Sequence, residues 1–218
     1  VVSDVVDGID CCIMAYGQTS SGKTYSMYGQ GWDDAEQLAQ STDLNNIASS
    51  SESQDASKVE EGSGVIPRSI HDLFQELESR AASATDDYVF TVHCQILQIY
   101  NEKIYDLLQD KRRENPLILR EAAGKKGGHN NKAAPGSSVY IPGMSVFRVH
   151  SREEVMNLLQ KGVKNRATRA TDFNVESSRS HTILQLFVNV EQPDEQGLTV
   201  LKRSTFSLVD LAGSEKWR

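Results

Sequence analysis

Long apolar runs are absent from this chain of 218 residues, and no secretory signal precedes its first apolar segment. A helix that spans a membrane needs about 20 consecutive apolar residues, so the sequence predicts no membrane span. With 38% hydrophobic and 24% charged residues, the composition is that of a globular protein. We therefore expect one domain with a substantial core.

Cysteine is also scarce, with three residues at Cys11, Cys12 and Cys94. Their small number and uneven spacing exclude a disulfide framework and a zinc site built from cysteine. All three lie in apolar segments with the pattern of strands. We therefore expect buried thiols in a reducing compartment.

The net charge of −7 belongs to a single segment, residues 32–63. This segment contains eight acidic residues and one basic residue, Lys58, so the rest of the chain sums to zero. It is rich in serine, glutamine and asparagine and lacks apolar periodicity, which favours a solvated loop insertion. The acidity therefore says little about the partners of the domain.

A second unusual segment, residues 122–138, is rich in glycine and holds Lys125, Lys126 and Lys132 without any acidic residue. Ordinary surface charge and a docking surface for an acidic partner would both explain such a loop. The lysines of the chain do not alternate with aromatic residues over any face. The sequence therefore gives little support for nucleic-acid binding.

Strand and helix patterns alternate along the remaining chain, which predicts an α/β sandwich around a central sheet. Apolar residues at helical spacing predict a helix that opens near Pro67. Ser151, with Glu154 three residues later, predicts the start of another helix. Strands are predicted at residues 11–16, 88–99, 182–190 and 199–208, and a strand pair at 117–119 and 139–141.

A glycine-rich loop follows the first predicted strand and has the spacing of a phosphate-binding P-loop. Strand, loop and then helix is the context that such a loop needs. Its glycines let backbone N–H groups point at an anion, its lysine reaches the β- and γ-phosphates, and its threonine hydroxyl binds Mg²⁺. The loop consists of Gly17, Gln18, Thr19, Ser20, Ser21, Gly22, Lys23 and Thr24.

Besides a phosphate-binding loop, phosphoryl transfer requires a metal ligand, a residue that orients the attacking water and loops that sense the γ-phosphate. Two later stretches contain candidates for these roles. Residues 174–181 collect hydroxyls and an arginine before a strand, and residues 210–215 end an apolar strand with an aspartate and a glycine. Each stretch alone is common, and the first is typical of a solvated loop or a phosphorylation site. The three motifs in this order are much more specific.

These residues resemble the kinesin motor domain, with residues 174–181 as switch I and 210–215 as switch II. Weaker similarities lie at residues 64–68, 99–108 and 165–166, so the resemblance spans the chain outside the two unusual segments. It implies a three-layer α-β-α P-loop NTPase fold with a central, mostly parallel sheet, incomplete at both ends. Residues 1–218 would then form a partial motor domain.

The resemblance implies ATP and Mg²⁺ as cofactors. Lys23 and the rest of the P-loop would hold the phosphates, and Tyr25 would stack on the adenine. Thr24, Ser178 and Asp210 would serve the metal ion.

The resemblance also assigns roles in catalysis to the two switches. Ser177 would orient the attacking water, and Gly213 would sense the γ-phosphate. Arg179 and Glu215 would form an ion pair when both switches close on ATP. For His181 we favour a structural hydrogen bond over a role as general base.

The implied function is ATP hydrolysis coupled to movement on microtubules, in the cytoplasm and on the cytoskeleton. Tubulin is acidic, so Lys125, Lys126 and Lys132 are candidates to contact it. A pseudo-motor without turnover and a GTPase stay open as alternatives, although the full set of site residues favours the ATPase. For the segment 32–63, regulation of nucleotide release and a tolerated insertion are both open.

Much of a kinesin motor lies outside this sequence. The family's first strand would precede Val1, and the switch II helix, the last strand and the neck would follow Arg218. We therefore expect the chain alone to be poorly stable and to show little microtubule-stimulated ATPase activity. Direction of travel, cargo, subfamily and oligomeric state depend on the neck and tail.

Overall fold

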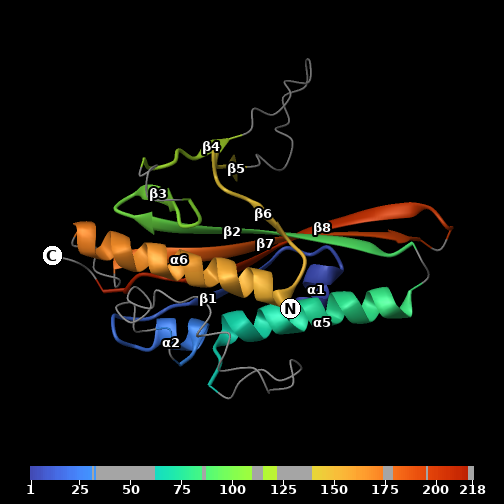
Figure 1. Cartoon of the computed structure of the whole chain (residues 1–218), viewed down its shortest axis with the longest axis horizontal. Coiled ribbons are helices and arrows are strands. Elements are labelled where there is room, and N and C mark those ends of the chain that lie inside the picture. The colour runs from blue at the N-terminus through green and yellow to red at the C-terminus, as the bar shows by residue number, and fades with distance from the viewer. Residues whose placement is uncertain are drawn as a thin grey trace.

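The computed structural model describes residues 1–30, 32, 62–84, 87–109, 115–121, 139–173, 179–194 and 196–215. Within these residues, six strands form one sheet in the order β1-β8-β7-β2-β3, with β6 paired to β2 (Figure 1). Two shorter strands form a separate pair. The strands are β1 (Cys11–Ala15), β2 (Val89–Tyr100), β3 (Lys103–Asp106), β4 (Arg120–Glu121), β5 (Val139–Tyr140), β6 (Phe147–Val149), β7 (Ser180–Pro193) and β8 (Thr199–Asp210).

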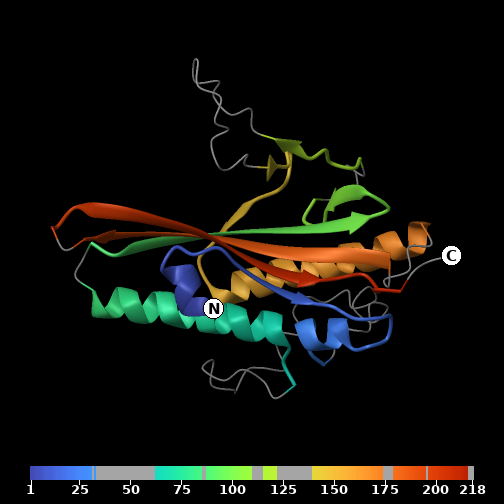
Figure 2. The same cartoon turned by 180° about the vertical axis from the view of Figure 1, so that it is seen from behind.

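The helices of the described residues lie together against one face of the sheet, as the two opposite views show (Figures 1 and 2). The expected α/β fold is therefore confirmed, and these residues contain the sheet and one helical layer. The longest helices begin where the sequence predicted, at Val65 and after Ser151. The helices are α1 (Val2–Val6), α2 (Lys23–Tyr28), α5 (Val65–Ser83) and α6 (Arg152–Phe173).

The sheet is mixed, whereas we predicted a mostly parallel one. β1 pairs with β8 in parallel, and each of the other pairings among the described strands is antiparallel. The reason lies in the connections, because antiparallel strands can be joined by short loops and parallel strands cannot. Asn101 and Glu102 alone connect β2 to β3, and both have positive φ angles, 47° and 60°, as a tight hairpin requires.

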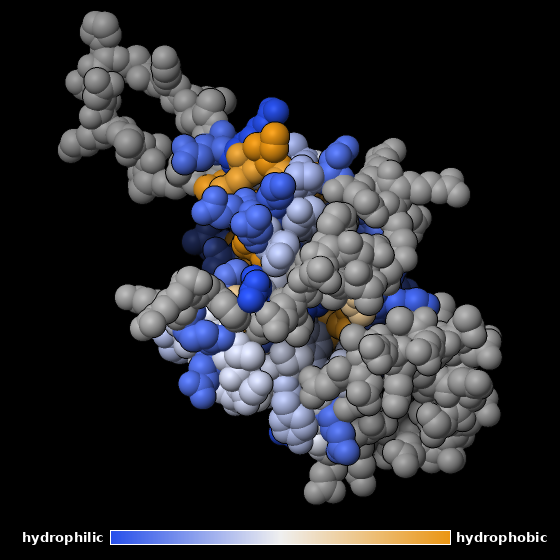
Figure 3. Space-filling view, turned by 90° about the vertical axis from the view of Figure 1, so that its left-hand side faces the viewer, coloured by the Kyte–Doolittle hydropathy of each residue, from blue (hydrophilic) through white to orange (hydrophobic). Residues whose placement is uncertain are grey.

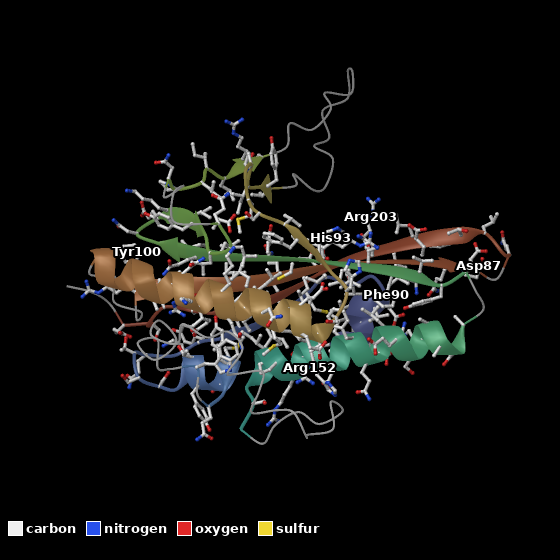
Figure 4. All side chains as sticks on the ribbon, viewed as in Figure 1. Asp87, Phe90, His93, Tyr100, Arg152 and Arg203 are labelled. Carbon is white, nitrogen blue, oxygen red and sulfur yellow. The ribbon has the colours of Figure 1, made fainter. Side chains whose placement is uncertain are left out.

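The core fills the space between the sheet and the helices. α5 buries Ile70, Leu73 and Leu77, which are all 0% exposed, at the helical spacing seen in the sequence. β7 buries alternate residues, as expected of a strand with one face on the core. α6 joins this layer through Arg152, which donates to Nδ1 of His71 on α5 at 3.1 Å (Figure 4).

β1 corrects the prediction of three buried thiols. Cys94 on β2 is buried, Cys11 is half-buried and Cys12 is exposed. Burial raises the pKa of the Cys94 thiol to about 12. In β1 the residues that face the helices are partly covered, while Met14 on the other face is 57% exposed. The prediction of a buried thiol was therefore wrong for Cys12 and only partly correct for Cys11.

Both unusual segments fall largely outside the described residues. Residues 122–138 lie wholly outside, and of residues 32–63 only Trp32, Gly62 and Ser63 are described. The pair β4–β5 flanks residues 122–138. β4 begins directly after the predicted strand at 117–119, and β5 lies within the predicted strand at 139–141. Apolar side chains are exposed on and beside this pair (Figure 3), namely Ile118, Leu119, Val139 and Tyr140.

No helix among the described residues is long and apolar enough to cross a membrane.

The acidic segment leaves and rejoins the domain at one point. Gly29 and Ser63 form an antiparallel bridge, the N–H of Gln30 donates to the Gly62 carbonyl at 3.1 Å, and the N–H of Gly64 donates to the Tyr28 carbonyl at 3.2 Å. Backbone pairing thus closes the segment at its base. The end of α2 and the start of α5 are held together whatever lies between them.

We expect that replacing residues 33–60 with a short Gly-Ser linker stabilises the domain by about 1 kcal/mol, because closing a shorter loop costs less entropy. Thermal unfolding would show this as a rise in Tm of about 2–4 °C. Nucleotide affinity should stay unchanged, since the base of the segment is intact. A changed rate of nucleotide release would instead support the regulatory interpretation.

Candidate functional site

The sheet brings the P-loop beside the second switch motif. β1 and β8 run in parallel, and Ala15 at the end of β1 is the register partner of Asp210 at the end of β8. The chain enters the P-loop after β1 and the 210–215 stretch at the end of β8. Because the carboxyl ends of parallel strands meet at one edge of a sheet, two motifs nearly 200 residues apart share one site.

The P-loop is a tight structure that holds its lysine close. Gly22 has a φ angle of 88° and immediately precedes α2, a conformation that glycine adopts without steric cost. Ser20 also has a positive φ angle, 62°, which is strained for a residue with a Cβ. The Lys23 ammonium donates to the carbonyls of Gly17 at 3.0 Å and Gln18 at 2.7 Å. The lysine charge therefore lies over the first turn of the loop.

Thr24 and Asp210 contact each other directly. The Thr24 hydroxyl donates to Oδ2 of Asp210 at 2.9 Å, and the Asp210 side chain is 3% exposed. The same oxygen lies 3.5 Å from a guanidinium nitrogen of Arg166 on α6. Oδ1 of Asp210 is buried and has no hydrogen-bond partner among the described residues. A buried carboxylate with one oxygen that lacks a hydrogen-bond partner among the described residues therefore lies beside the P-loop.

The second switch motif also touches the P-loop. The Glu215 carboxylate accepts the backbone N–H of Thr19 at 2.9 Å and the Thr19 hydroxyl, and the Ser214 N–H donates to the Gly17 carbonyl at 3.0 Å. Hydrogen bonds from Thr19 lower the pKa of the Glu215 carboxyl. A Cβ on Gly213 would meet both Glu215 and the Thr19 hydroxyl within 2.5 Å. Only glycine fits at position 213 while this contact exists.

His181 holds the same strand end in place. Its Nδ1 atom accepts the Ala212 N–H at 3.0 Å, so the structural hydrogen bond that the sequence analysis favoured is confirmed. The bond links β7 to the segment that follows Asp210, and it uses a ring nitrogen that a general base would need.

The remaining predicted residues are divided between described and undescribed parts of the chain. Ser177, Ser178 and the three lysines of 122–138 lie outside the described residues. Tyr25 is 53% exposed on α2. Arg179 is described and exposed, and its pairing with Glu215 stays a prediction for the state in which both switches close.

The comparisons with known proteins agree on one family. The sequence model of the family described as "Kinesin motor domain" matches residues 1–218. This chain belongs to the kinesin motor domain family.

Individual kinesins match nearly the whole of this kinesin domain. Kinesin-like protein KIN-5B of Oryza sativa subsp. japonica is 34% identical over 223 residues, and Klp61F of Drosophila melanogaster is 33% identical over 215 residues. Each alignment covers 99% of the chain but only 18% and 17% of these relatives. A solved structure, "Structure of a fast kinesin: Implications for ATPase mechanism and interactions with microtubules", superposes with a TM-score of 0.71 at 31% identity, covering 99% of this chain and 48% of the other.

The donors of this kinesin domain fit Mg²⁺. A threonine hydroxyl and a carboxylate are oxygen ligands, which Mg²⁺ prefers, and it usually takes few protein ligands beside phosphate and water. The unpartnered Oδ1 of Asp210 supplies the observation that a further ligand is expected there. The described residues contain no group of three or more His, Cys, Asp or Glu side chains that could hold a metal without a phosphate.

Two residues that the sequence analysis did not assign complete the site of this kinesin domain. Arg166 lies against Asp210, and the fully buried hydroxyl of Tyr28 forms a hydrogen bond with Arg166. Residues 165–166 had been noted only as a weak family similarity. A sequence gives no sign of which strand end a helical arginine will face, because that depends on the order of the strands.

Proposed function

We propose that this chain is the nucleotide-binding part of a microtubule motor that hydrolyses Mg²⁺-ATP. The observation that carries the proposal is the set of direct contacts between the P-loop and switch II, from Thr24 to Asp210 and from Thr19 to Glu215. A site that couples phosphate binding to a change in switch conformation needs such contacts.

The P-loop would bind the phosphates through its backbone and its lysine. In the structure a carboxylate, that of Glu215, already accepts the Thr19 N–H, which supports the capacity of this loop to bind an anion. A phosphate oxygen would accept the same N–H. Lys23, which lies over the loop, would contribute a charge-assisted hydrogen bond to the phosphates.

Thr24 and Asp210 would hold the metal ion, which when bound neutralises charge on the phosphates. Thr24 would contribute its hydroxyl oxygen, and Asp210 would orient a water or bind directly through its open Oδ1. Ser178, from switch I, would complete this set. All three offer the oxygen chemistry that Mg²⁺ requires.

Switch II would report on the γ-phosphate. Once a phosphate accepts the Thr19 N–H, Glu215 would lose this partner and become available to Arg179. Gly213 would offer its N–H to the γ-phosphate, and Ser177 would orient the attacking water. The exchange of Glu215 between two partners would link phosphate binding to switch closure.

Two measurements test this function. Equilibrium titration of the 218-residue chain with a fluorescent ATP analogue should show binding that Mg²⁺ strengthens. A complete motor that carries this chain should release inorganic phosphate from ATP faster when microtubules are added. Binding without phosphate release would favour the pseudo-motor, and a preference for GTP would favour the GTPase. Absence of nucleotide binding would contradict the proposal.

For microtubule contact we propose the basic loop at residues 122–138. Replacing Lys125, Lys126 and Lys132 together with alanine in a complete motor should weaken co-sedimentation with microtubules about fivefold to tenfold at low salt, because attraction to acidic tubulin is lost. The salt dependence of the affinity should also decrease. Lys58→Ala, in the acidic segment, serves as the control. Unchanged affinity and salt dependence in the triple variant would rule out this role.

A further inference from the structure

Arg166 connects the helix that precedes switch I with the proposed metal site. It lies near the C-terminal end of α6, and a guanidinium nitrogen is 3.5 Å from Oδ2 of Asp210. The two side chains are only 12% and 3% exposed. Because a buried carboxylate is costly without a nearby positive charge, this arginine stabilises the Asp210 side chain away from water.

Tyr28 also interacts with the guanidinium. This tyrosine ends α2, is 3% exposed and forms a hydrogen bond with Arg166. Burial raises the pKa of Tyr28 to about 12, so its hydroxyl stays protonated. Arg166 has only donors, so the hydroxyl oxygen of Tyr28 accepts this bond. The guanidinium is therefore fixed at two points.

Asn165 fixes the helix itself at the same turn. Its side-chain amide donates to the carbonyl of Leu107, just after β3, at 2.7 Å. Gly162, one turn earlier, packs against Ile96 of β2, where a Cβ would come within 3.4 Å of the isoleucine side chain. The position of Arg166 is thus set by the sheet as well as by Tyr28.

We propose that Arg166 is a positioning residue that orients Asp210 for Mg²⁺. Arg166 and Thr24 both engage Oδ2, which leaves Oδ1 as the oxygen available to the ion or to its water. Because α6 ends at Phe173, just before residues 174–181, the same arginine ties the helix that precedes switch I to the end of β8 and to α2. Partners that orient metal-binding side chains are typically needed for full metal affinity.

This inference rests on the proposed nucleotide and Mg²⁺ site, and its test separates the two. The affinity of the 218-residue chain for a fluorescent ADP analogue is measured in EDTA and in Mg²⁺, and the ratio of the two Kd values is the gain from Mg²⁺. In Arg166→Met we expect this gain to fall about 10-fold or more. The Kd in EDTA should stay within about twofold of wild type, because Arg166 acts through Asp210 rather than on the phosphates.

Further variants separate orientation from charge and from folding. Arg166→Lys keeps the charge but lacks the planar fork, and it should recover most of the gain. Tyr28→Phe removes one hydrogen bond and should lower the gain about twofold to threefold, a change that is measurable even if Arg166→Met does not fold. Arg80→Met is the matched control, since Arg80 on α5 pairs with Asp7 and Glu76 at 2.7 Å each, far along the chain from the site. It should lower the Tm without changing the gain.

Three outcomes would overturn the inference. A gain from Mg²⁺ that is unchanged in Arg166→Met and in Tyr28→Phe would assign Arg166 a purely structural role. A gain that rises in Arg166→Met would show that the arginine competes with the metal. A wild-type chain that binds the analogue without any gain from Mg²⁺ would overturn both the inference and the proposed metal site. Because this measurement needs no variant, failure of the metal site is distinguished from failure of the role of Arg166.

Discussion

Lys23→Ala is expected to weaken the binding of ATP by the 218-residue chain by about 100-fold or more. The lysine ammonium is the positive charge that lies over the P-loop, 3.0 Å and 2.7 Å from the carbonyls of Gly17 and Gln18. Truncating one partner of a hydrogen-bonded charge pair in a site typically costs about 2–5 kcal/mol, and each 1.4 kcal/mol is about tenfold in affinity. Titration with a fluorescent ATP analogue in Mg²⁺ measures the effect.

Lys202→Ala is the control for the loss of charge. Lys202 pairs with Asp7 at 3.4 Å near the start of β8, whereas Asp210 ends that strand, and the lysine is partly exposed. Such a surface pair contributes about 0–1 kcal/mol to stability, and its loss should leave nucleotide affinity unchanged. If Lys23→Ala bound ATP as tightly as Lys202→Ala, the loop would not be acting as a phosphate-binding P-loop.

Gly64→Ala should strongly destabilise the domain, although it adds only a methyl group. The φ angle of Gly64 is −77°, so alanine would meet no conformational penalty. However, a Cβ there would lie 2.5 Å from the backbone atoms Gly29 N and Met27 O. Backbone cannot move aside as a side chain can, so we expect a loss of about 3 kcal/mol or more.

Thermal unfolding followed by circular dichroism would show the loss as a drop in Tm of about 6–12 °C. Gly197→Ala provides the converse case, because Gly197 has a φ angle of 77° but no atom within 4 Å of the place that a Cβ would occupy. That variant should lose only about 1–2 kcal/mol, from backbone strain. Equal losses in the two variants would show that the contact between α2 and α5 has space to open.

The sequence was sufficient to predict those elements whose pattern is local. The helix from Val65 to Ser83 and the strands β7 and β8 lie where apolar periodicity placed them. The P-loop followed from its spacing, and the contact between Thr24 and Asp210 agrees with the pairing of two motifs in one site. These features depend on residues close in the chain or on a motif with a fixed chemistry.

What the sequence could not predict depends on how distant segments pack. The direction of each strand follows from its connections and partners, so the mixed sheet was missed. The exposure of Cys12 follows from the position of β1 in the sheet rather than from its apolar neighbours. The contact between Glu215 and Thr19 joins residues 196 positions apart, and Arg166 faces Asp210 only because of the order of the elements. No local pattern marks such contacts.

The unequal exposure of the three cysteines has a practical consequence. A thiol-reactive fluorophore would react first at Cys12, because the thiol of Cys94 is buried and its raised pKa keeps it protonated. Cys12 lies on β1, the strand that leads into the P-loop. A dye at this native position could therefore report on events at the nucleotide site without an engineered cysteine.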